Sequence, residues 1–398
     1  MHALPEDHTG VRIARLRRER HLTQKALSQL SGVPYSTLTK TEQGRIPSTP
    51  HVIAACARAM RVEVATIVGQ PYVASLREDE LDVLIRPIRN ALDVYDLGPD
   101  PDIVARRPEV LHTAADELCK AVRGGDIKKA ASDVAGLVEE ATTAAHTTRS
   151  RQGWLTLASL YRTSYDVAAK LGYPDLAQLA LARMDWAAHR GSDAILGGLT
   201  QYLRALTYLR EGNFRTGGRL VTIGLSTLEQ AEATHERKVV TGQLHLGAAV
   251  MAGRAHDGER AKEHLDAAER VSRDTGEAIK VHWLAFGPTN VATHRVSVFA
   301  ELDQYSKAVT AAAGMHIPSD WPKSRTSHHH AEVARAQVWT GKLDHAFQSL
   351  LKARKAAPQQ AKYSPTVRET YASLEAAHRR LPESFLSYGA WLGPSHSH

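Results

Sequence analysis

Apolar side chains recur along almost the whole chain at the three- and four-residue spacing of amphipathic α-helices, and strand-type alternation is nearly absent. In the first seventy residues, apolar positions and helix-capping residues predict five short helices. They are expected at about residues 11–20, 24–31, 35–43, 50–60 and 64–68. From residue 76 onward the pattern continues as longer helices joined by short turns. It therefore predicts an all-α protein with a small N-terminal domain and a long helical remainder.

The second and third predicted helices are joined by a short turn. Thr23 is suited to cap the second helix, Gly32 to adopt the positive φ of the turn, and Val33 to fill the space between crossing helices. The third helix is short and polar, with Leu38 as its main buried anchor and Gly44 at its end. A polar helix after a glycine-containing turn is typical of a recognition helix, which enters the DNA major groove with hydrogen-bonding side chains.

The positive charge of the chain is concentrated in the same segment. The first seventy residues hold ten Lys and Arg against five Asp and Glu, so +5 of the net charge of +7 lies there. A local basic excess is what a polyanion-binding module requires. Charge alone also fits a helical bundle with a solvated basic face.

The run LTQKALSQLSGVPYSTLTKTEQG at residues 22–44, with Pro47 and the helix that follows, resembles the Cro/repressor (XRE) family of helix-turn-helix regulators. The resemblance implies a five-helix, lambda-repressor-like DNA-binding domain at residues 11–70. It implies that Gln24 bonds a phosphate or braces the third helix, and that Thr39 lies at the groove edge. Residues that would face the groove are Tyr35, Ser36, Thr37 and Lys40, and candidates for DNA-backbone contacts are Arg15, Arg18 and Arg45.

Two residues depart from the family pattern in the third helix. Pro34 replaces the usual polar cap, and Thr41 stands where an apolar residue is usual. Both are expected to loosen this helix slightly. The helix also lacks an Arg or Asn at its tip, so we expect sequence choice to depend on short polar side chains and on DNA shape.

Turn signals recur through the rest of the chain at steps of about 47, 40, 45, 46 and 38 residues. They lie at residues 124–126, 172–174, 212–214, 257–258, 303–305 and 341–343. Two amphipathic helices fit between successive turns, which is typical of a helical solenoid in which each hairpin packs on its neighbours. The turns at Gly212-Asn213-Phe214 and Gly341-Lys342-Leu343 resemble those of tetratricopeptide repeats (TPR), although the period is longer.

These patterns predict how the chain is divided. We expect a flexible N-terminus at 1–10, a linker with a connecting helix at 71–100, a TPR-like domain at 101–382 and a tail at 383–398. A final helix at about 365–381 is expected to cap the solenoid.

The segment WLAFGPTN, residues 283–290, interrupts the repeat pattern. Trp283, Phe286, Asn290 and His294 are spaced by three, four and four, so we expect them on one helix face. Two aromatic rings beside an amide and an imidazole suit a ligand with apolar and polar parts. The alternative interpretation is that Pro288 kinks a packing helix and the aromatic rings belong to the core.

Other positions on the first helix of each pair are candidates for a concave groove, and ordinary packing is the alternative for each. They are Tyr161, Tyr165, Gln201, Tyr202, Gln243 and His245. The motif FGPTN, with the later runs RTSHHHAEVARAQ and APQQAKYSP, resembles the sensor half of actinobacterial XRE–tetratricopeptide regulators. Their relatives in architecture are the RRNPP receptors, so the resemblance implies a peptide or small-molecule effector.

Other chemistry is not indicated. His328, His329 and His330 with Glu332 suggest a metal site, but consecutive histidines radiate around a helix, so a solvent-facing helix start is the preferred interpretation. Cys56 and Cys119 lie in apolar helical patterns, which favours a reducing cytoplasm. Phosphate-binding loops, nucleophile elbows and zinc-protease motifs are absent from the sequence, as is any apolar run long enough to span a membrane. We expect no enzyme activity, metal or cofactor.

The sequence thus predicts a transcriptional regulator that binds a double-stranded DNA operator as a homodimer, because paired recognition helices meet half-sites ~34 Å apart. The helical domain would bind the effector and supply the dimer surface. A scaffold that recruits a protein partner to DNA is the alternative.

Overall fold

The computed structural model describes residues 8–377 and 382–393. Over these residues the backbone forms helices, and its extended pairing is limited to a single bridge between Ala278 and Phe286. None of the described helices is both long enough and apolar enough to cross a membrane. The all-α prediction is therefore confirmed.

Five helices form the N-terminal domain, as predicted. They are α1 (Thr9–Glu19), α2 (Gln24–Ser31), α3 (Tyr35–Glu42), α4 (Pro50–Met60) and α5 (Val64–Val68). Thr23 and Thr49 cap α2 and α4 through their side-chain oxygens, and Gly32 ends α2 with φ 73°. Ile13, Leu27, Leu38, Cys56 and Ile67 are fully buried in one core.

The flexible N-terminus expected at 1–10 is wrong for its last three residues, because α1 begins at Thr9. The ring of His8 accepts a hydrogen bond from the backbone N–H of Gly10 and so caps the helix. His8, Thr9 and Gly10 are all buried. Residues 1–7 lie outside the described part of the chain.

The expected linker at 71–100 contains α6 (Val73–Glu78), the short 3₁₀ helix η1 (Asp82–Leu84) and α7 (Ile85–Asp93). Here α7 packs against α9 (Ile127–Thr148) and α11 (Pro174–Arg190) of the helical remainder. Ile88, Ala91 and Leu92 join its core. The connecting helix therefore belongs to the body of the molecule.

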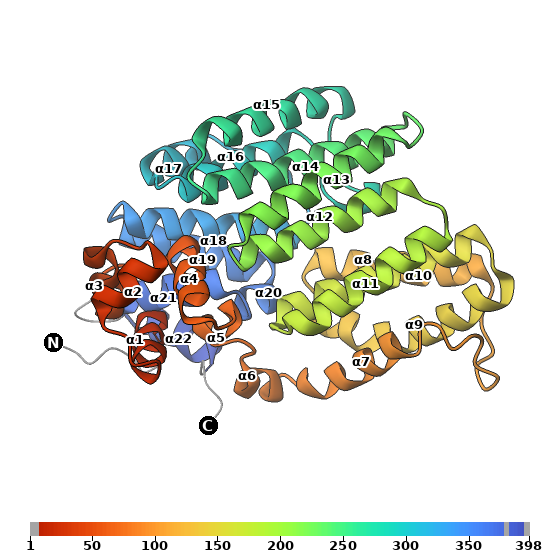
Figure 1. Cartoon of the computed structure of the whole chain (residues 1–398), viewed down its shortest axis with the longest axis horizontal. Coiled ribbons are helices and arrows are strands. Elements are labelled where there is room, and N and C mark those ends of the chain that lie inside the picture. The colour runs from red at the N-terminus through yellow and green to blue at the C-terminus, as the bar shows by residue number, and fades with distance from the viewer. Residues whose placement is uncertain (1–7, 378–381, 394–398) are drawn as a thin grey trace.

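The remainder consists of antiparallel helix pairs stacked side by side, as a solenoid requires (Figure 1). Besides α9 and α11, its helices up to residue 275 are α8 (Pro108–Gly124), α10 (Arg151–Leu171), α12 (Ala194–Arg210), α13 (Phe214–Glu229), α14 (His235–Arg254) and α15 (Gly258–Thr275). The later helices are η2 (Val281–Trp283), α16 (Pro288–Glu301), α17 (Tyr305–Ala313), α18 (Lys323–Trp339), α19 (Leu343–Ala356), α20 (Pro358–Lys362), α21 (Pro365–Ala377) and α22 (Glu383–Leu392).

The stack of pairs curves until its ends meet. Helix α18 packs against α8, and α20 packs against α9. At this closure Gly125 leaves no room for a side chain, since a Cβ there would lie 2.6 Å from the Cβ of Ala357. The backbone N–H of Lys128 also donates to the side chain of Gln359 at 2.8 Å. The solenoid is therefore a closed ring of helices.

The segment 277–287, which we call the strap, connects α15 to α16 by crossing to the opposite side of the ring. The Trp283 indole donates to Asp116 on α8 at 2.6 Å, and Arg162 on α10 donates to the carbonyl of His282. His282, Trp283 and Ala285 have positive φ, a backbone conformation that costs free energy in non-glycine residues.

The predicted helix face through residues 283–294 is wrong. Trp283 and Phe286 lie in the strap, and only Asn290 and His294 lie on α16. Pro288 is the first residue of α16, where its fixed φ and missing N–H are tolerated, so it starts a helix and does not kink one.

The tail expected at 383–398 is wrong for its first ten residues, which form α22. Phe385, Tyr388 and Leu392 are buried in a core with α19 and α21, and the Phe385 ring stacks on Tyr371. The predicted capping helix is observed as α21, with α22 as its partner. Residues 378–381, including the expected end of the capping helix, and 394–398, with the expected tail Ser395–His398, lie outside the described residues.

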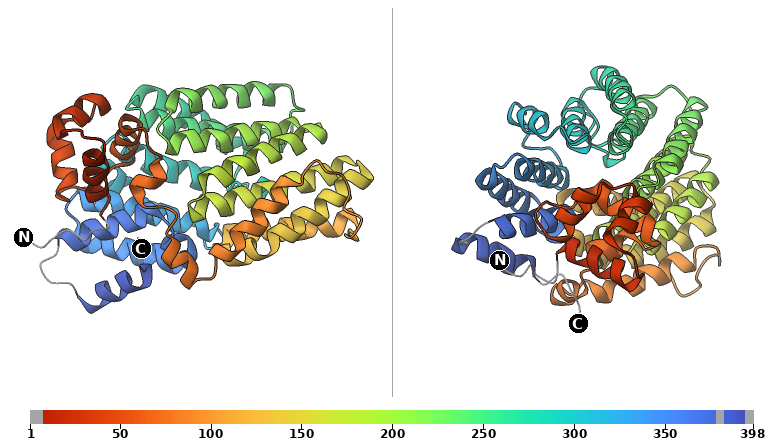
Figure 2. Two further views of the ribbon diagram at one scale, coloured as in Figure 1. Left: turned by 60° about the horizontal axis from the view of Figure 1, so that its bottom comes forward. Right: turned by 60° about the vertical axis from the view of Figure 1, so that its left-hand side comes forward.

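The N-terminal domain lies across one open end of the ring (Figure 2, right). It contacts the ends of three successive inner helices. Arg58 of α4 donates to the carbonyl of Gly212 at 2.8 Å, and the ring of His51 lies 3.2 Å from the carbonyl of Arg254. A Cβ on Gly172 would meet the side chain of Gln70 at 2.9 Å. The turns that carry the repeat signal therefore form the platform for this domain.

Candidate nucleic-acid interface and central cavity

The helix α3 presents its polar side chains away from the ring, because the domain docks through α4 and the residues around it. Tyr35 is 48% exposed, Ser36 and Lys40 are exposed, and Thr37 and Thr39 are half-buried. Leu38 is the apolar side chain that anchors α3 in the core. The face that the sequence assigns to the major groove is therefore open to a ligand.

Gln24 ties α2 to α3. Its amide nitrogen donates to the carboxylate of Glu42 at 2.8 Å, and Glu42 also accepts two hydrogen bonds from Arg17 at 2.7 and 2.8 Å. Tyr35 and Thr39 both reach the Gln24 carbonyl oxygen at 3.5 Å. Of the two roles considered for Gln24, bracing α3 is the one seen in this geometry.

The arginines considered for backbone contacts lie at the surface. Arg15, Arg18 and Arg45 are exposed. Arg15 is 3.7 Å from Glu19 on the same helix, and Arg18 donates to the carbonyl of Ala14 at 3.1 Å. Such exposed contacts contribute little and exchange readily for a phosphate.

The two departures in α3 have local consequences. Pro34 caps α3 without a side-chain hydrogen bond. The hydroxyl of Thr41 is fully buried and has no hydrogen-bond partner. Gly10 lies against Thr41 so closely that a Cβ would be 1.9 Å from its carbonyl oxygen. The backbone contact of α1 with α3 is therefore close, and the buried hydroxyl carries an unmet desolvation cost.

A cavity of about 760 Å³ occupies the centre of the ring. The inner helices α10, α12, α14, α16 and α18 line its sides, and Trp283 and Leu284 of the strap also border it. The N-terminal domain contributes further lining residues, including Arg12, Ser48, Ile53 and Val68. The volume lies in the range of small-molecule sites, ~300–1,000 Å³.

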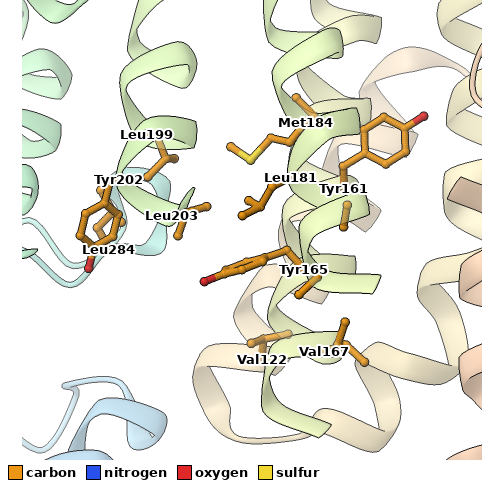
Figure 3. Close-up of a cluster of buried hydrophobic side chains, with 14 of the residues drawn as sticks. Val122, Tyr161, Tyr165, Val167, Leu181, Met184, Leu199, Tyr202, Leu203 and Leu284 are labelled. Carbon is orange, nitrogen blue, oxygen red and sulfur yellow. The ribbon is translucent and has the colours of Figure 1, made fainter. Parts of the chain in front are cut away.

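Half of the predicted ligand residues border this cavity. Those in its lining are Tyr165, Tyr202, Gln243, Trp283 and His294. Tyr165 and Tyr202 extend from α10 and α12 toward the same space, whereas Tyr161 lies on the other side of α10 (Figure 3).

The other predicted ligand residues pack elsewhere. Phe286 is fully buried against Gly242, and Tyr161 is fully buried in the core. Gln201 accepts a hydrogen bond from Arg204 at 3.2 Å, and His245 pairs with His264 of α15 at 3.0 Å between their Nδ1 atoms. These four are structural in this geometry.

Asn290 is fully buried and organises a hydrogen-bonded chain beside the cavity. Its amide donates to Gln243 at 3.1 Å, and Gln243 donates to the hydroxyl of Tyr202 at 2.7 Å. Arg325 of α18 donates to the Asn290 carbonyl oxygen at 2.5 Å. The FGPTN motif therefore fixes one wall of the cavity by joining α12, α14, α16 and α18.

The sequence did not identify the charged residues of the cavity. Glu301 accepts hydrogen bonds from Arg254 and Arg335, and Arg335 also pairs with Glu332 at 2.6 Å. Although burial alone would raise it, the charges of the two arginines lower the pKa of Glu301 to about 2.

On α10, Arg162, Asp166 and Lys170 recur every four residues along an otherwise apolar face. This four-residue spacing is the sequence feature from which the charged face of α10 could have been recognised. Only the tertiary structure shows that this face points into the ring.

The solvent-facing interpretation of the histidine run is wrong. His329 and Glu332 are buried, and the accessible side chain of His328 borders the cavity. Burial lowers the pKa of His329 to about 4, which favours a neutral ring. Over the described residues, no cluster of three metal-ligating side chains is found.

Residues 8–67 match the family model described as "Helix-turn-helix domain". This match covers α1 to α5 up to the last turn, and together with the exposed polar helix α3 it indicates a DNA-binding regulator. Comparison of the chain with curated proteins and with solved structures gave no match.

Proposed function

We propose that this chain is a one-component transcriptional regulator of the XRE–tetratricopeptide kind, in which the N-terminal domain binds an operator and the ring binds an effector in its central cavity. The observation that carries the proposal is the shared boundary between the two parts. Ser48, Ile53 and Val68 of the DNA-binding domain border the same cavity as Tyr165 and Tyr202 of the ring.

This shared boundary provides a physical route for control. An effector in the cavity touches the inner helices whose ends hold the DNA-binding domain at Gly172, Gly212 and Arg254. A ligand that favours one spacing of these helices also favours one position of the docked domain. The effector would then shift populations between arrangements with different operator affinity.

The size of the cavity favours a small molecule over a peptide. Ring closure places the concave face of the solenoid inside the molecule, and the DNA-binding domain covers one end. We favour an effector site over a scaffold, because the DNA-binding domain covers one end of the ring and shares the lining of the cavity.

Dimerisation belongs to the proposal. The helix α3 lacks an Arg or Asn at its tip, so a single copy offers few strong base contacts. Two copies on one operator, with half-sites ~34 Å apart, would supply the missing affinity. The actinobacterial origin and the relation to RRNPP receptors also remain parts of the proposal.

The test is selection of bound duplexes from a randomised DNA pool by the full chain. We expect an enriched site with two half-sites and a log–log salt dependence of its affinity.

Lys40→Ala should weaken binding to all duplexes and reduce the salt slope by ~1, because one phosphate contact is lost. The matched control is Lys120→Ala on α8, an exposed lysine far from α3. Recovery of no preferred sequence would contradict the proposal, and an unchanged slope would remove Lys40 from the interface.

A further inference from the structure

The interior of the ring holds a cluster of cations that the chain itself does not neutralise. The cluster comprises Arg123, Arg162, Lys170, Arg210 and Arg325, all of which border the cavity. They come from α8, α10, α12 and α18, so ring closure is what brings them together.

One carboxylate lies within the cluster. Asp166 pairs with Arg123 at 2.5 Å. Over the described part of the chain, the other four cations have no carboxylate within ion-pair distance. Their hydrogen bonds go to neutral oxygens: Arg162 donates to the carbonyl of His282, Lys170 to Gln360 at 2.6 Å and Arg210 to the hydroxyl of Tyr165 at 3.3 Å.

Several donors of the cavity wall are left without any partner. The Nε atoms of Arg123, Arg162 and Arg325 are buried and unpaired, as are the indole nitrogen of Trp321 and the hydroxyl of Ser324. Arg162 itself is only 4% exposed. Buried donors are normally satisfied, and each one left unpaired destabilises the unliganded chain. Such a set of donors around one cavity suits a ligand that accepts hydrogen bonds.

The pKa of Lys170 shows the electrostatic stress in this cluster. Burial and, to a smaller extent, the charges of Arg123, Arg210 and Arg325 lower it to about 8 against the opposing effect of Asp166. Burial likewise lowers the pKa of Arg162 and of Arg325. Charged forms of these residues are therefore destabilised until a negative charge enters the cavity.

We propose that the effector of the ring is a small molecule with two or more negative charges, carried by phosphate or carboxylate groups, which bind to Arg162, Lys170, Arg210 and Arg325. This inference rests on the proposed effector site and names its ligand class. Guanidinium groups suit both oxyanions because their N–H groups match them in pairs. The rings of Tyr165 and Tyr202 line the same space and leave room for an organic body.

The first measurement is calorimetric titration of the full chain with inorganic pyrophosphate and, separately, with citrate at constant ionic strength. We expect one molecule of at least one anion to bind per chain and to raise the melting temperature. Pyrophosphate alone would indicate a phosphorylated effector, and citrate alone a polycarboxylate. The trication spermidine should leave the melting temperature unchanged. If neither anion binds, the inference is overturned.

The variant Lys170→Met separates a binding role from a structural one. It should weaken anion binding at least about tenfold, because a charge-assisted contact is lost. It should also raise the melting temperature of the unliganded chain, since a half-buried charge without a carboxylate at ion-pair distance has been removed. If Lys170 has only a structural role, the variant should instead lower the melting temperature and leave the affinity for the anion unchanged. Lys120→Met on the outer surface is the matched control, and Arg325→Gln repeats the test if the first variant does not fold.

DNA affinity measured on the same samples keeps the two proposals apart. Sequence-specific DNA binding without anion binding rejects the ligand class and leaves the regulator. Anion binding that does not change DNA affinity supports the ligand class and rejects the switch.

Discussion

At the scale of single residues, the roles predicted from the sequence match the structure best where the local backbone conformation determines which residue type is suitable. Thr23, Gly32 and Leu38 occupy the cap, turn and anchor positions that their chemistry predicts. Thr41 also stands where expected, on the buried side of α3, and its hydroxyl has no partner there. Its environment shows that a polar residue can remain in a core when the rest of the helix is held by other contacts.

Thr41→Val should stabilise the N-terminal domain by about 1 kcal/mol, because it removes an unsatisfied buried hydroxyl and keeps the volume. The measurement is hydrogen exchange of the α1 and α3 amides in the full chain. Thr49→Val is the matched comparison: its hydroxyl caps α4, so its loss should cost about 1 kcal/mol. Faster exchange in Thr41→Val would show that the hydroxyl makes a contact absent from this structure.

At the scale of elements, glycines determine how closely the helices of the ring approach the strap. Gly242 of α14 lies under the ring of Phe286, and a Cβ there would be 2.0 Å from the Phe286 Cζ atom. The Ala278–Phe286 bridge fixes the shape of the strap, and its contacts with Asp116 and Arg162 attach it to α8 and α10. The sequence singled out the FGPTN segment as an interruption of the repeat pattern, but it did not predict the conformation of the strap, where His282, Trp283 and Ala285 have positive φ.

Gly242→Ala should destabilise the chain by ~1–3 kcal/mol, since the added methyl overpacks the contact with Phe286. The comparison is Gly218→Ala on α13, where a Cβ meets no atom within 4 Å. That variant should gain up to ~1 kcal/mol from the higher helix propensity of alanine. Urea unfolding of both variants checks the pair, and equal effects would mean that the strap moves to accommodate the methyl group.

At the scale of the whole molecule, ring closure buries ionisable groups that come from distant parts of the chain. Besides Arg162 of the cationic cluster, it buries His294 on α16 and His329 on α18. The pKa of His294 is lowered to about 3, first by burial and then by the charge of Arg325. These histidines are neutral in the folded chain at any pH above their lowered pKa values.

The free energy of unfolding should therefore fall as the pH is lowered from about 6.5 toward 4. Over this interval the unfolded chain binds protons at His294 and His329 that the folded chain does not, and above pH 6.5 their contribution is fully present. His294→Gln should reduce the slope by about one proton, or ~1.4 kcal/mol per pH unit. His316→Gln, at an exposed position, serves as control. A slope that is the same in both variants would place His294 in contact with solvent.

The sequence by itself determined the helices, their order, the DNA-binding domain and the regular turns, because these depend on local capping, turn residues and helical periodicity. Only the tertiary structure decided that the solenoid closes, that Phe286 packs inward while Trp283 crosses to α8, and that α22 packs as a helix. It also decided that Arg162 and Lys170 meet Arg210 and Arg325 inside one cavity. Contacts between residues more than a hundred positions apart leave no periodic trace in the sequence. The recognition helix could therefore be predicted from the sequence, whereas the charged interior of the ring could not.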